Sequence, residues 1–63
     1  MKTGNILIVD DNRGALSALK LLLQFEFNKV VTISNPNQIN SELQRQEFDV
    51  ILLNLCQFGL FAL

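Results

Sequence analysis

The sequence predicts an α/β fold in which a parallel sheet is built in the order strand, helix, strand, helix, strand. Two runs of consecutive apolar residues, 6–9 and 50–53, indicate strands that are covered on both faces, as in parallel sheets. A β-branched run at 30–33 indicates another strand. The intervening segments are long enough for the right-handed helical crossovers that parallel strands require. The pattern therefore corresponds to about half of a doubly wound sheet.

The first strand is expected at about residues 5–10, and a helix is expected at about residues 12–27. The side chain of Asn12 can cap the start of this helix, and Asn28 is a candidate for its C-cap. Apolar residues at helical spacing predict one broad buried stripe, consisting of Leu16, Leu19, Leu22, Leu23 and Phe27.

Gly14 lies in the first turn of this helix, where glycine costs about 1 kcal/mol relative to alanine. Two explanations stay open. Either another group approaches the backbone closely at this position, or glycine is tolerated near a helix end.

A second strand is expected at about residues 29–34 and a second helix at about residues 36–47. The start of that helix is indicated by Asn35 as N-cap and by Pro36 at the first helical position. Its apolar stripe consists of two residues, Ile39 and Leu43, so the helix should cover the sheet along a narrow line.

The third strand is expected at about residues 49–55. It is apolar without alternation, and with three strands in the sheet it would have an open edge. Such an edge pairs readily with another strand, so we expect the chain to form homo-oligomers through it.

The composition limits the possible functions. The chain has 63 residues, is 49% hydrophobic and has a net charge of −1 without a basic cluster, which argues against direct nucleic-acid contact. The single cysteine, Cys56, fits a reducing cytoplasm, and no apolar run is long enough for a membrane span. The chain has no histidine and no glycine-rich phosphate loop, so we do not expect an enzyme acting on a separate substrate.

Asp10 and Asp11 follow the first strand directly. In open α/β sheets, ligands bind outside the carboxyl ends of the strands, so these two carboxylates lie where a functional site is expected.

Taken in order, these residues resemble the receiver domain of two-component response regulators. The acidic pair after an Ile-Leu-Ile-Val strand carries the resemblance, together with the segment Phe-Asp-Val-Ile-Leu-Leu at 48–53. The resemblance covers residues 5–59 and implies residues 1–63 to be a partial receiver domain. The implied fold is a flavodoxin-like doubly wound parallel sheet, truncated to β-α-β-α-β.

The resemblance also implies a magnesium site formed by Asp10, Asp11 and the residue at the phosphoacceptor position, here Asn54. Magnesium prefers oxygen ligands and commonly uses one or two carboxylates. The alternative is that the acidic pair only caps the following helix and interacts with its dipole. An amide at position 54 removes one negative charge, so any magnesium would be held less tightly.

The implied function is that of a receiver module in a phosphorelay, in signal transduction that can include the regulation of transcription. Its implied partner is a histidine kinase or a phosphotransfer protein. Because an amide oxygen is too weak a nucleophile to form an acyl phosphate, Asn54 should not be phosphorylated. The alternative is a pseudo-receiver or fragment that acts as a structural dimerisation module. Phe58 and Gly59 stand where the family usually has a loop with proline and glycine.

Overall fold

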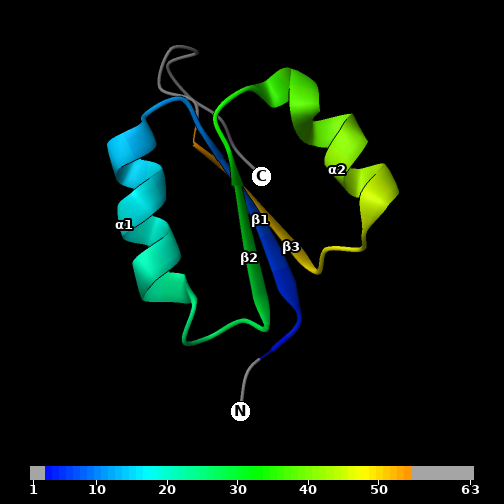
Figure 1. The fold of residues 1–63 in the computed structure, drawn as a ribbon. Helices are drawn as coiled ribbons and strands as arrows, with labels where there is room; N and C mark the ends of the chain where they lie inside the picture. The colour runs from blue at the N-terminus through cyan, green and yellow to red at the C-terminus, as the bar shows by residue number, and fades with distance from the viewer. Residues whose placement is uncertain (1–2, 55–63) are drawn as a thin grey trace.

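A computed structural model of the chain describes residues 3–54, and these form a three-stranded parallel sheet with a helix on each face (Figure 1). The strands are β1 (Asn5–Asp10), β2 (Lys29–Ile33) and β3 (Val50–Asn54), in the spatial order β2-β1-β3. This order is compatible with a truncated flavodoxin-like fold, whose sheet begins with the strand order 2-1-3. Cys56, Phe58 and Gly59, about which the sequence made predictions, lie outside the described residues.

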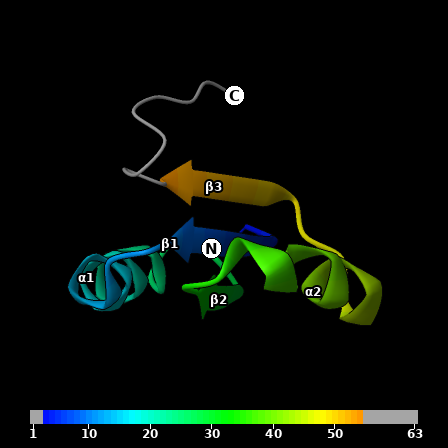
Figure 2. The same ribbon diagram turned by 90° about the horizontal axis from the view of Figure 1, so that it is seen from above.

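The central strand β1 is buried on both faces, as its four consecutive apolar residues predict. Ile6 and Ile8 pack against the helix α1 (Arg13–Leu23), whereas Leu7 and Val9 face the opposite side. All four side chains are at most 3% exposed. Figure 2 shows the two helices on opposite sides of the sheet. The hydrophobic core is therefore two clusters separated by the plane of the sheet.

The start of α1 follows the prediction. The Oδ1 atom of Asn12 accepts a hydrogen bond of 3.0 Å from the backbone N–H of Ala15, which makes Asn12 the N-cap. A Cβ atom added to Gly14 would lie 3.2 Å from this Oδ1 atom. The group that lies close to Gly14 is thus the capping side chain itself, which favours the close-approach explanation for this glycine.

The predicted apolar stripe of α1 is only partly correct. Leu16 is buried, and Leu19, Leu23 and Phe27 pack around it, but Leu22 is 69% exposed. At about 100° per residue, Leu22 lies about 120° around the helix from Leu16 and so misses the sheet. The prediction that Leu22 is buried was therefore wrong.

The end of α1 also differs from the prediction. The helix ends at Leu23 with Gln24 as C-cap, so Asn28 is not the cap. The backbone N–H groups of Glu26 and Phe27 both donate to the carbonyl oxygen of Leu23, at 2.9 and 3.1 Å. This tight turn brings Phe27 back onto the core, which explains why the apolar pattern continues beyond the helix.

The second helical segment begins where Asn35 and Pro36 predict. The Asn35 side chain accepts a hydrogen bond of 2.9 Å from the N–H of Asn37. The segment is divided into a 3-10 turn, η1 (Pro36–Gln38), and the α-helix α2 (Ile39–Arg45).

In α2, Ile39 packs against the core, but Leu43 is 42% exposed, contrary to the predicted stripe. The helix ends soon after Leu43, at Arg45, because Gln46 adopts an extended conformation. Within the described chain, α2 therefore covers its face of the sheet mainly through one side chain.

Hydrogen bonds join the start of β1 to the segment before β3. The backbone N–H of Asn5 donates to Oδ2 of Asp49 at 2.8 Å, and the N–H of Asp49 donates to the carbonyl oxygen of Asn5 at 2.9 Å. The Asn5 side chain donates to the carbonyl oxygen of Glu47 at 2.9 Å. Gly4 has a φ of +53°, and a Cβ atom there would overlap with the Asp49 carboxylate. This junction therefore requires glycine at position 4.

Candidate functional site

Asp10 is the last residue of β1 and is almost completely buried, with 1% of its surface exposed. Its Oδ1 atom accepts a hydrogen bond of 2.9 Å from the backbone N–H of Asn12. This bond closes the turn between the strand and α1. The carboxylate is thus held in a defined position at the carboxyl edge of the sheet.

Asp11 follows Asp10 directly but has an exposed side chain. The helix that follows is capped by Asn12, and its first turn contains no acidic residue. Capping of α1 therefore does not require Asp11, and Asp10 contributes to the helix start through the turn rather than as the cap. The capping part of the alternative is therefore wrong, because Asn12 is the cap, whereas both carboxylates still lie next to the positive end of the α1 dipole.

Position 54 is brought next to Asp10 by the pairing of β1 with β3. In this parallel register, the Cα atom of Asp10 is the partner of the Cα atom of Asn54. Neighbouring strands lie about 4.8 Å apart, so the backbones of these two residues are adjacent. The backbones of Asp10 and Asn54 thus lie side by side at the carboxyl edge of the sheet, and Asp11 follows Asp10 in the chain. Ligands of open α/β sheets bind outside this edge.

These three residues offer two carboxylates and one amide. Their donor atoms are oxygens, and this type of donor fits a hard cation such as magnesium. Within residues 3–54, no group of three or more His, Cys, Asp or Glu side chains is arranged to hold a metal ion. The candidate site provides two such side chains, Asp10 and Asp11, because residue 54 is asparagine.

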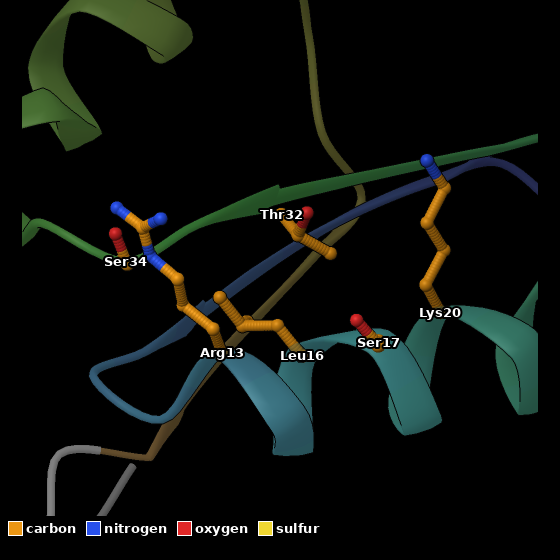
Figure 3. A pocket seen from close by; sticks show the side chains of 6 residues that line it. All are labelled: Arg13, Leu16, Ser17, Lys20, Thr32 and Ser34. Carbon is orange, nitrogen blue, oxygen red and sulfur yellow. The ribbon is translucent and has the colours of Figure 1, made fainter.

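A polar hollow that the sequence analysis missed lies between α1 and β2, and its lining does not include the acidic pair (Figure 3). Its volume is about 360 Å³, and its lining includes Arg13 and Lys20. The sequence signal for this hollow was the spacing of seven residues between these two cations on one helix, which places them on the same side.

Comparison of the sequence with known proteins relates the chain to part of a bacterial regulatory protein. No protein-family profile and no solved structure matches the chain. A match among curated proteins supports a relationship to a region of a response regulator, a class of signal-transduction regulator. The matched protein is the alginate biosynthesis transcriptional regulatory protein AlgB of Pseudomonas aeruginosa, with 41% identity over 54 residues.

The match covers 86% of the present chain but 12% of AlgB. The chain thus spans about one eighth of the length of this relative. In the described part of the chain, no helix combines the length and apolar character needed to cross a membrane.

Proposed function

We propose that this chain is the amino-terminal part of the receiver module of a phosphorelay response regulator. The relative's name, a transcriptional regulatory protein, supports an output in the control of transcription. A histidine kinase or a phosphotransfer protein is the proposed partner, and the cytoplasm is the proposed location. The chain itself carries no catalytic role on a separate substrate.

One observation carries the proposal. Asp10 at the end of β1 is the register partner of Asn54 at the end of β3, and Asp11 follows Asp10 directly. A receiver domain requires an acidic pair beside a phosphoacceptor position at the carboxyl edge of the sheet. This register supports that arrangement.

In this proposal, Asp10, Asp11 and Asn54 hold a magnesium ion, whose charge would stabilise the oxygens of a phosphoryl group. The buried Asp10 carboxylate is oriented by the N–H of Asn12, whereas the exposed Asp11 is free to adjust to a ligand. Because position 54 is an amide, the electrostatic attraction for magnesium is reduced.

Asn54 also prevents the phosphorelay reaction at this position. An acyl phosphate forms when an ionised carboxylate attacks phosphorus, and an amide oxygen lacks the nucleophilicity required. The chain is therefore proposed to be a receiver that receives no phosphoryl group.

The test is incubation with acetyl phosphate and magnesium, followed by intact-mass spectrometry. The native chain is expected to gain no phosphoryl mass. A full-length domain carrying Asn54→Asp is expected to gain one phosphoryl group, and the same domain carrying both Asn54→Asp and Asp11→Ala should gain much less. An Asn54→Asp domain that gains no mass contradicts the receiver mechanism.

A second candidate function, a structural dimerisation module, is favoured by the position of β3. This apolar strand is at an edge of the described sheet, and Val50 at its start is 42% exposed. Pairing of two β3 edges would cover this surface. The two functions can coexist if the dimer contact is confined to the part of β3 that precedes Asn54, because Asp10 and Asp11 do not belong to this strand.

A further inference from the structure

We propose that the hollow between α1 and β2 binds a small molecule that carries two anionic groups about 10 Å apart. The lining of this hollow does not include Asp10, Asp11 or Asn54, so the inference does not depend on the receiver proposal. Helix geometry places the Cα atoms of Arg13 and Lys20 about 10 Å apart along the axis, because they are seven residues apart on α1 and each residue adds about 1.5 Å. We take this as the spacing of the anionic groups, because both side chains are exposed and long enough to adjust to a ligand.

The lining of the hollow is cationic at both ends and rich in hydroxyl groups between them. Figure 3 shows Arg13 and Lys20 rising from α1 on either side of Thr32, with the Arg13 head directed toward Ser34. The full lining consists of Arg13, Leu16, Ser17, Lys20, Thr32 and Ser34. It contains no carboxylate, although the whole chain has more acidic than basic residues, six against five. An anion is therefore the complementary ligand.

Both cations are available for a ligand. Among residues 3–54, the ion pair present is Arg45 with Glu42 at 3.4 Å, and neither Arg13 nor Lys20 takes part in one. Arg13 and Lys20 are exposed, while the buried Leu16 forms the base of the hollow. Arginine and lysine can donate several charge-assisted hydrogen bonds to carboxylate or phosphate oxygens, and each hydroxyl can add one more.

The size of the hollow favours a small molecule. Its volume of about 360 Å³ is near the lower end of typical ligand pockets, which begin at about 300 Å³. A single small anion would reach one of the two cations. A ligand with an anionic group at each end would reach both and would cover Leu16 and Thr32 between them.

The test uses a length series of dicarboxylates, namely succinate, adipate and suberate, titrated into the chain by calorimetry at constant ionic strength. Suberate, which is long enough to reach both cations, is expected to bind more tightly than succinate by up to about fivefold, the gain from one additional exposed ion pair. The bisphosphonate of the same length as suberate forms a second arm. Whichever of the two binds more tightly identifies the ligand as a carboxylate or a phosphate compound.

Charge-matched variants distinguish binding in this hollow from nonspecific electrostatic attraction of the anion to the chain. Arg13→Gln or Lys20→Gln should remove the length dependence, so that suberate binds no better than succinate. Lys29→Gln and Arg45→Gln each remove one positive charge outside the lining, and both variants should retain the length dependence. Circular dichroism verifies that all four variants are folded. The proposal is overturned if affinity does not depend on ligand length, or if all four variants reduce binding equally.

Discussion

Asp10 and Asn54 are partners in the parallel register of β1 and β3, although 43 residues separate them in the sequence. The sheet thus places a buried carboxylate beside an asparagine, at the position where the proposed receiver function would require an acid. Because Asp11 is exposed next to this pair, the three residues can be tested separately.

Replacing Asp11 by alanine should weaken magnesium binding without changing the fold. Asp11 is exposed and follows the strand rather than belonging to it, so its loss removes a ligand and no packing. Isothermal titration with magnesium should show at least tenfold weaker binding, about 1.4 kcal/mol. Glu47→Gln, an exposed carboxylate far along the chain, is the control and should bind magnesium as the native chain does. Equal binding by Asp11→Ala and the native chain contradicts the proposed site.

Replacing Gly4 by alanine should lower the free energy of unfolding by more than about 1 kcal/mol. A side chain at a positive φ is strained, and its Cβ atom would displace the Asp49 carboxylate from the N–H of Asn5. Urea denaturation measures the change. Gly14→Ala is the matched control, because the φ of Gly14 is not positive. The new methyl group would raise the helix propensity of this position, but it would also press on the side chain of Asn12, and the two effects oppose each other. The free energy of unfolding of Gly14→Ala should differ from that of the native chain by less than about 1 kcal/mol.

The two leucines Leu16 and Leu22 should respond very differently to the same substitution. Leu16→Ala leaves a cavity against Ile6 and Ile8 and should cost about 2–5 kcal/mol. Leu22→Ala removes an exposed side chain and should change stability by about 0.5 kcal/mol or less. Similar losses in the two variants would mean that α1 packs with a different face toward the sheet.

The native chain should form species larger than a monomer at micromolar concentration, because the apolar β3 edge lacks a partner among the described strands. Light scattering measures this. Val50→Lys places a charge at that edge and should shift the chain toward the monomer. Leu22→Lys adds the same charge on the outer face of α1 and should leave the oligomer unchanged. A stable native monomer contradicts the prediction, and dissociation by Leu22→Lys alone assigns the contact to α1.

The features that the sequence predicted correctly are local ones. Asn12 and the Asn35-Pro36 pair act on the first turns that follow them, and the run 6–9 is too apolar for a strand with a solvent face. These signals depend on neighbours in the chain. Nothing beyond the segment itself was needed to interpret them.

The features that the sequence did not predict depend on how segments pack. The exposure of Leu22 and Leu43 depends on how each helix is rotated over the sheet, and several rotations are compatible with a leucine-rich pattern. The contact of Gly4 with Asp49 joins residues that are far apart in the sequence. The position of Asn54 beside Asp10 could be anticipated from the resemblance, but the register in which β1 and β3 pair could be determined only from the folded sheet.

The central place of β1 has a consequence for folding during synthesis. β1 precedes both of its partners in the chain, yet its pairing with β3 is complete only when residue 54 has been made. At synthesis rates of about 5–20 residues per second, its buried side chains wait roughly 2–9 s for that second partner. During this interval the strand with the most buried side chains among the described residues has at most β2 as a partner, whereas α1 needs only residues up to Leu23 to form its backbone hydrogen bonds.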